Sequence, residues 1–141
     1  MLIEMELKEI QIVDDPSRPQ VIILGEKDGK RAFPIYIGYF EAHALDIAVK
    51  GIITPRPMTH DLIYNVLDSL GLHAERILVD ELRDDTFFGK LVVKDGNSEE
   101  YLIDSRPSDA IILAAKRNLP IFVDDGILRE VSGNYALPDD I

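Results

Sequence analysis

The chain has 141 residues, and among them there is no cysteine, no tryptophan and only three histidines: His43, His60 and His73. The absence of cysteine excludes disulfides, thiolate zinc sites, iron–sulfur clusters and cysteine nucleophiles. With so few histidines, a metal site has to be built mainly from carboxylates, which are the ligands of hard divalent cations.

Basic residues are also few. The sequence has 15 Lys and Arg against 26 Asp and Glu, which gives a formal net charge of -11. A surface this acidic repels the phosphate backbone, so a protein that coats nucleic acid through a general basic surface is excluded. Any contact with nucleic acid therefore has to be local or assisted by a metal ion.

Long apolar runs are missing as well. No stretch approaches the ~18 residues of a membrane span, and the first residues alternate apolar with charged side chains, unlike a signal peptide. We therefore expect a cytoplasmic protein with no membrane partner. The hydrophobic content of 46% is enough for a packed core, and the length fits one domain. We expect this domain over residues 1–132 and a polar tail over residues 133–141.

Hydrophobic periodicity predicts seven strands and three helices. Asp28-Gly29 and Asp95-Gly96 are typical of hairpin turns. Pro107 suits the first turn of a helix, and Thr59 suits the residue that caps one. These signals predict an α+β fold with a mostly antiparallel sheet and helices. The predicted strands are 2–13, 21–24, 32–37, 73–82, 86–93, 100–104 and 119–123, and the predicted helices are 39–50, 60–70 and 107–118.

The two halves of the chain follow the same order. Three strands and a helix are followed by a linking helix, and then by three strands and a helix again. A shift of 66 residues aligns Ile37 with Ile103 and Ala44 with Ala110. We interpret this as an internal duplication of a β-β-β-α unit joined by a linking helix. Coincidence is the alternative, because helix faces repeat alanine and leucine readily.

Two Arg-Pro segments, residues 56–61 and 104–109, carry the most unusual chemistry. Each ends at the start of a predicted helix, and each has a guanidinium, a hydroxyl and a carboxylate within a few residues. The start of a helix presents free N–H groups to anions, and arginine binds phosphate in a bidentate manner. These segments therefore predict phosphate binding by Arg56, Thr59, Arg106 and Ser108.

The acidic residues of the same segments suit hydrolysis of a phosphodiester. Asp61, Asp104 and Asp109, with Glu41 as a further candidate, could hold Mg²⁺ or Mn²⁺. Such an ion polarises the phosphate and lowers the pKa of a bound water. His60 could bind the ion or act as a general base. The predicted catalytic residues are therefore His60, Asp61, Asp104 and Asp109, and the hypothesis requires the two segments to converge on one cleft.

A structural interpretation of the same residues stays open. Thr59 and Ser108 could only cap helices, and Asp61 and Asp109 are favoured in a first turn by the helix dipole alone. The arginines would then pair one to one with nearby acids. The protein would be a non-enzymatic regulatory module that oligomerises or binds a protein or a small anionic ligand. A homodimer or higher homo-oligomer is compatible with either interpretation.

Three segments in this order resemble the bifunctional nuclease domain family. They are residues 34–38 followed by Glu41-Ala42, residues 56–62 and residues 104–111. The resemblance implies a compact α+β domain that degrades both DNA and RNA, so nucleic acid is the expected partner. It identifies no catalytic residue, and the roles given above are inferences from the chemistry of the side chains. The family's motif positions map to Glu41, Arg56, His60, Asp61, Asp104, Arg106 and Asp109.

Overall fold

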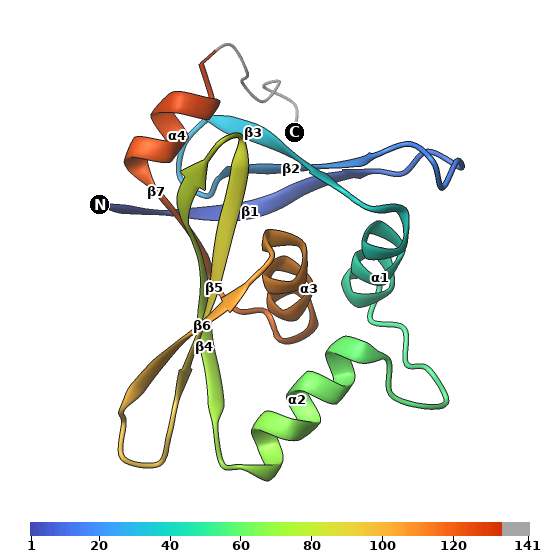
Figure 1. Ribbon diagram of the computed structural model, residues 1–141, viewed down its shortest axis with the longest axis vertical. Helices are drawn as coiled ribbons and strands as arrows, with labels where there is room; N and C mark the ends of the chain where they lie inside the picture. The colour runs from blue at the N-terminus through green and yellow to red at the C-terminus, as the bar shows by residue number, and fades with distance from the viewer. Residues whose placement is uncertain (134–141) are drawn as a thin grey trace.

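The computed structural model describes residues 1–133, which form one sheet and the helices packed against it (Figure 1). The predicted tail lies outside the described residues from residue 134 onward. Within residues 1–133 the strands are β1 (Leu2–Gln11), β2 (Gln20–Glu26), β3 (Ala32–Ile37), β4 (His73–Arg83), β5 (Thr86–Lys94), β6 (Glu100–Ser105) and β7 (Ile121–Asp124). The helices are α1 (Tyr39–Val49), α2 (Thr59–Ser69), α3 (Pro107–Arg117) and α4 (Asp125–Val131).

The strand order in the sheet is β3-β2-β1-β7-β4-β5-β6. Every neighbouring pair is antiparallel except β4 and β7, which are parallel, so the predicted α+β class with a mostly antiparallel sheet is confirmed. The last strand along the chain is thus inserted between the two halves. It joins the meander β1–β3 to the meander β4–β6. This arrangement suits two related units, but two unrelated meanders could also adopt it, so the duplication stays a prediction.

The turn between β4 and β5 shows how local sequence sets the register. Asp84 and Asp85 both have left-handed backbone conformations, with φ of 50° and 59°. Two such residues in succession give the tight turn that matches the twist of a hairpin, and aspartate tolerates this conformation better than most residues. The turn brings Arg83 opposite Thr86 and places the β4–β5 tip close to the end of β3 and the start of α3.

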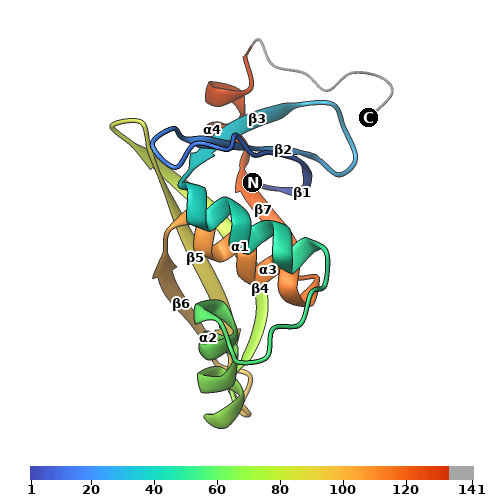
Figure 2. The same ribbon diagram turned by 90° about the vertical axis from the view of Figure 1, so that its right-hand side faces the viewer.

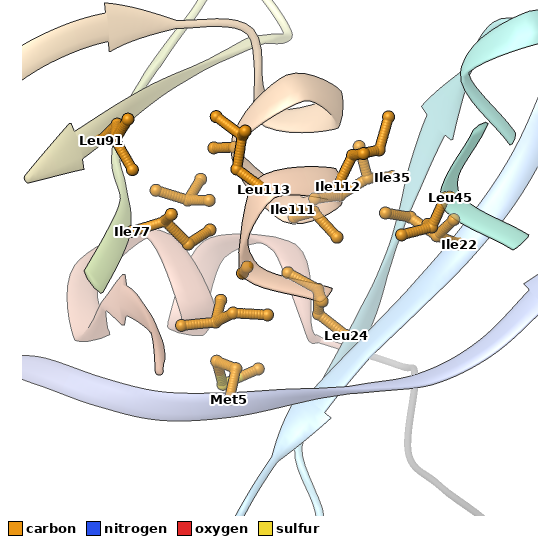
Figure 3. Packing of buried hydrophobic residues seen from close by; sticks show 14 of the residues in the cluster. Met5, Ile22, Leu24, Ile35, Leu45, Ile77, Leu91, Ile111, Ile112 and Leu113 are labelled. Carbon is orange, nitrogen blue, oxygen red and sulfur yellow. The ribbon is translucent and has the colours of Figure 1, made fainter. Parts of the chain in front are cut away.

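Helix α3 is the centre of the core. Ile111 and Ile112 are completely buried, and Leu113 is nearly so, because the helix is covered by α1 on one side and by β4 and β5 on another (Figures 2 and 3). Pro107 is its first residue and Asn118, at φ 53°, ends it in a left-handed conformation. In the sequence, the run Ile111-Ile112-Leu113 places apolar side chains all round the helix and so predicts a helix covered on several sides, which the structure confirms. Its rigid placement fixes the residues at its start.

The other two predicted helices differ in how they pack. Helix α1 lies against α3 and buries Ala42, Leu45 and Ala48. Helix α2 lies below them in Figure 1 and contacts α3 and β4 more sparingly. Its outer face exposes Leu62, Val66 and Leu70. Because so little of α2 is buried, its position depends on polar contacts with α3.

Helix α4 is absent from the predictions. It has only seven residues, with Gly126 in its first turn, so it carries little periodicity. The Asp124 carboxylate caps it by accepting a hydrogen bond from the Gly126 N–H at 3.0 Å. Ile127 and Leu128 are buried in the same core as α3. Tertiary packing therefore stabilises a helix whose own sequence only weakly favours one.

Candidate functional site

A series of polar contacts, here called the polar ladder, joins α2 to α3. Its three rungs pair residues that are 49 positions apart and that recur every four residues along both helices. The His60 Nε2 lies 2.9 Å from the Asp109 Oδ1. One turn further on, the buried Tyr64 hydroxyl donates to the Leu113 carbonyl. The rungs are His60–Asp109, Tyr64–Leu113 and Asp68–Arg117.

The last rung is a bidentate ion pair at the surface. The Arg117 guanidinium donates to both oxygens of Asp68, at 3.0 and 2.8 Å, and its carbon lies 3.9 Å from the centre of the Tyr64 ring. Burial raises the pKa of Tyr64 to about 12, so the phenol stays protonated and keeps its hydrogen bond. Through its first rung, the polar ladder brings His60 near the end of the first Arg-Pro segment into contact with Asp109 at the end of the second.

At its first rung, the ladder meets α1. Four residues form what we call the helix-start cluster: Glu41, His60 and Asp109 from the first turns of α1, α2 and α3, and Arg106, which precedes α3 as its capping residue. Arg106 donates from Nε to Asp109 Oδ2 at 2.9 Å and from Nη2 to Asp109 Oδ1 at 3.2 Å. Its Nη1 donates to Glu41 Oε1 at 3.2 Å. Gly38 leaves room for the Glu41 carboxylate, because a side chain there would collide with it.

The charges of the cluster are set by these contacts. Burial raises the pKa of Asp109, but the hydrogen bonds from Arg106 and His60 outweigh it, so the pKa is lowered. The hydrogen bond to Asp109 raises the pKa of Arg106. An ionised carboxylate only accepts, so a neutral His60 has its proton on Nε2 and its lone pair on Nδ1. That Nδ1 has no hydrogen bond within residues 1–133.

Asp61 lies outside this cluster and has different partners. Its Oδ1 is 2.6 Å from the Lys116 Nζ, and its Oδ2 accepts from the Met58 N–H at 2.9 Å. Both contacts, that with Lys116 first, lower the pKa of Asp61. Met58 is therefore the capping residue of α2 and Thr59 is the first helical residue, so the predicted cap at Thr59 is wrong. The Asp61 carboxylate, three residues after Met58, binds the backbone N–H of that capping residue, as in the second half of a capping box.

The remaining predicted site residues are dispersed. Asp104 is exposed on β6, opposite Lys90, and makes no ion pair within residues 1–133. Thr59 is exposed. Arg56 is exposed in the connection between α1 and α2, and its guanidinium has no ion-pair partner in the described part of the chain. Ser108 is buried beside Arg106. The two Arg-Pro segments thus meet through His60 and Asp109.

The carboxylates are poorly placed for a divalent cation. Across residues 1–133, no group of three or more histidine, aspartate or glutamate side chains is arranged to hold a metal ion. Glu41 and Asp109 both bind Arg106, and Asp61 binds Lys116. As arranged, this donor set does not fit Mg²⁺ or Mn²⁺, because the positions that a cation would take are occupied by cationic side chains. A metal site here requires Arg106 to move away.

A pocket of about 620 Å³ adjoins the helix-start cluster. We call it the arginine pocket, because Arg18 and Arg106 both line it. Its walls come from the β1–β2 loop, the end of β3, the β4–β5 turn and the start of α3, segments that lie on one side of the molecule in Figure 2. Arg18 was not among the predicted residues, since no sequence signal links the β1–β2 loop to α3.

The ion pairs between α2 and α3 predict loss of stability in acid. Three aspartates have a lowered pKa in the folded protein. Lys116 is the main cause for Asp61, and Arg117 is the main cause for Asp68. Burial raises the pKa of Asp109, but the hydrogen bonds from Arg106 and His60 outweigh burial and lower it. Groups with lowered pKa stabilise the fold above the ordinary aspartate value of 3.8 and stop doing so as pH falls below it. We expect the melting temperature to drop as pH falls below 3.8, and to drop less steeply in Asp61→Asn.

Thermal unfolding monitored by circular dichroism over a pH series measures this. Asp104→Asn is the matched control, because it removes an exposed carboxylate that has no ion pair within residues 1–133. An Asp61→Asn protein whose melting temperature changes with pH as steeply as that of the wild type would contradict the assignment of acid sensitivity to these pairs.

No helix formed by residues 1–133 combines the length and apolar character needed to cross a bilayer.

Comparison of the sequence with known proteins identifies the family to which the chain is similar. The bifunctional nuclease domain model matches residues 22–135. An uncharacterized protein of Mycobacterium tuberculosis is 33% identical over 128 residues, which cover 91% of this chain and 74% of the relative. Bifunctional nuclease 1 of Oryza sativa subsp. japonica is 28% identical over 87% of this chain and 37% of the relative. Bifunctional nuclease 1 of Arabidopsis thaliana is 26% identical over 89% of this chain and 41% of the relative.

The chain thus spans less than half the length of these plant relatives and about three quarters of the mycobacterial one. The family model describes the domain alone and matches residues 22–135, which are most of this chain, so the greater length of the relatives does not affect this match. It includes α1, α2 and α3, and with them every residue of the helix-start cluster. The chain therefore belongs to the bifunctional nuclease domain family.

Proposed function

We propose that this protein is a nuclease that hydrolyses phosphodiester bonds of DNA and RNA at the helix-start cluster. Membership of the family supports the reaction class. The observation that carries the proposal is the His60–Asp109 hydrogen bond of 2.9 Å directly beside the exposed guanidinium of Arg106. A histidine oriented by a carboxylate and a cation next to it are the groups required for general base catalysis at a phosphate.

Each residue of the cluster has a distinct role in this proposal. Asp109 accepts a hydrogen bond from the Nε2–H of His60 and orients the ring, which leaves the Nδ1 lone pair to take a proton from the attacking water. Arg106 binds the phosphate. Three of its N–H groups go to Glu41 and Asp109, and its side chain is 63% exposed, so further N–H groups can bind phosphate oxygens. Glu41 positions Arg106 from the opposite side.

Assistance by Mg²⁺ or Mn²⁺ stays part of the hypothesis. Asp61, Asp104, Asp109 and Glu41 are the predicted ligands, and an ion bound there would polarise the phosphate. Because the carboxylates of Glu41 and Asp109 are bound to Arg106, their use as ligands requires that pair to open. Cleavage of single- and double-stranded DNA and RNA by the purified protein, with either ion or with EDTA, distinguishes metal-assisted from metal-independent hydrolysis.

Arg106→Lys tests the phosphate-binding role. Lysine keeps the positive charge but cannot bind Asp109 and a phosphate with a planar set of donors, so we expect kcat/KM to fall about tenfold or more. The assay is initial cleavage rate against substrate concentration. Arg129→Lys, in α4 and paired with Asp125, is the matched control and should retain the wild-type rate. Equal rates for both variants and the wild type would contradict the role of Arg106.

A second function is favoured by a specific observation. The acids of the two segments pair with cations, Asp61 with Lys116 and Asp109 with Arg106, and the outer face of α2 exposes a row of leucine and valine. This is the pattern expected of a regulatory module that forms a homodimer or higher homo-oligomer, or binds a protein or a small anionic ligand. A folded wild-type protein that cleaves no substrate under any ionic condition would favour this function.

A further inference from the structure

The arginine pocket brings two cationic side chains together on an acidic protein. The formal net charge of the chain is -11, but the charged residues in the pocket lining are Arg18, Arg106 and Asp85. Arg18 is exposed and has no ion-pair partner among the described residues, so its charge is available. Asp109 and Glu41 offset the charge of Arg106, so the charge that attracts an anion of limited size is the unpaired guanidinium of Arg18, with the exposed N–H groups of Arg106 beside it as further donors.

A second observation points to a polar ligand. Ser108 is only 7% exposed and lines the arginine pocket, but its side chain has no hydrogen-bond partner within residues 1–133. Among the described residues, the polar side-chain atoms that are fully buried and lack a partner are His43 Nε2 and Ser105 Oγ, so the Ser108 hydroxyl is open to the pocket and free to bind a ligand. It lies in the first turn of α3, where backbone N–H groups are free to bind an anion. A phosphate oxygen at this position would satisfy both Ser108 and the start of the helix.

The rest of the lining is aromatic and apolar. Tyr36 is 67% exposed, and Tyr39 and Phe87 line the same pocket together with Pro19 and Pro107. An exposed aromatic ring next to arginines is the combination that proteins use to stack a nucleobase while holding its phosphate. In the sequence the aromatic and basic residues do not alternate, and only the fold brings them together. The volume of about 620 Å³ lies within the range of small-ligand pockets.

We propose that the arginine pocket binds one unpaired nucleotide of a single-stranded nucleic acid, with the base against Tyr36 and the phosphate between Arg18, Arg106 and Ser108. This rests on the proposed function, since it gives the substrate class of the same site. A base enters a pocket only when it leaves the stack and its pairing partner, which costs free energy in a duplex and little in a single strand. The protein therefore selects single strands.

Fluorescence anisotropy tests the proposal by binding alone. The probes are labelled single strands of DNA and RNA, about 12 nucleotides long, and the matching DNA duplex, all in EDTA. We expect the single strands to bind at least about tenfold more tightly than the duplex. Tyr36→Ala should weaken single-strand binding about 5- to 150-fold. Arg18→Ala should reduce the slope of log affinity against log salt by about 0.7, as for one phosphate contact.

Two matched controls change residues outside the arginine pocket. Tyr101→Ala removes an exposed tyrosine on β6, and Arg129→Ala removes an exposed arginine on α4. Both variants should bind like the wild type. Equal affinity for single strand and duplex, or wild-type binding by folded Tyr36→Ala and Arg18→Ala, would overturn the pocket assignment even if the protein cleaves nucleic acid. Selective single-strand binding that needs both residues would support it. Such binding without cleavage would overturn the proposed function and leave the assignment intact.

Discussion

His60→Ala is expected to lower kcat/KM for nucleic acid cleavage by about 100- to 10,000-fold, the usual contribution of a general base. The imidazole is the group of the helix-start cluster that suits a general base, because Arg106 is a cation and the carboxylates of Asp109 and Glu41 are bound to it. The loss should fall mainly on kcat, since the phosphate-binding arginines stay in place. Cleavage rates at saturating and limiting substrate measure it.

Loss of activity has to be separated from loss of folding. His60 is buried and holds α2 to α3, so alanine there removes one rung of the polar ladder. His60→Gln is the second variant, because its amide can still donate to Asp109 but cannot act as a base at neutral pH. His73→Ala is the matched control, an exposed histidine at the start of β4. Rates in folded His60→Gln equal to those of His73→Ala would refute general base catalysis by His60.

The elements of the fold could largely be predicted from sequence, because their signals are local. The predicted strand over residues 32–37 matches β3, and Pro107 begins α3 as expected. The buried run Ile111-Ile112-Leu113 correctly indicated a helix covered on several sides. Turns and periodicity depend on neighbouring residues, so the sequence records them, although the start of α2 was predicted one residue too late.

The position of β7 could not be predicted in the same way. Its apolar run indicates a buried strand, but nothing local says that it pairs with β1 on one side and with β4 on the other. The single parallel pair of the sheet results from this insertion. Pairing between strands more than 40 residues apart in sequence is decided by the packing of the whole core, which a pattern within one segment does not record.

The candidate site was predicted by residue type, but its pairings were not. Arg106 and Asp109 are three residues apart on one helix, so their contact could be expected. The partners of Asp61 and Asp109 on other elements, Lys116 and His60, depend on how α2 lies on α3. One signal was present in the sequence: residues 60, 64 and 68 and residues 109, 113 and 117 share a four-residue spacing. A search for polar residues with matched spacing could have found the polar ladder.

Arg18 shows the limit of such reasoning. It lies in a loop whose composition predicts only a turn, and its role depends on the β1–β2 loop reaching the start of α3. The roles of Asp61, Asp104 and Glu41 as metal ligands stay predictions. In the structure Asp61 lies in the first turn of α2 and Glu41 binds Arg106, in line with the alternative interpretation, which placed Asp61 there for the helix dipole and paired the arginines with nearby acids.

Ile112→Ala is expected to lower the free energy of unfolding by about 2–5 kcal/mol, the usual cost of a cavity in a packed core. Ile112 is completely buried in the core around α3 (Figure 3), so the space it leaves cannot be filled by solvent. Urea unfolding followed by circular dichroism measures the change. Leu62→Ala, on the exposed outer face of α2, is the matched control and should change stability by less than about 0.5 kcal/mol.

The comparison between these two variants also tests how the site is held. Arg106, Ser108 and Asp109 all lie at the start of α3, so the buried face of that helix fixes their positions relative to Glu41 and His60. If packing of α3 positions the cluster, folded Ile112→Ala should lose activity at temperatures well below its melting point, whereas Leu62→Ala should not. Full activity in Ile112→Ala up to its melting point would show instead that the ion pairs of Arg106 suffice to hold the site together.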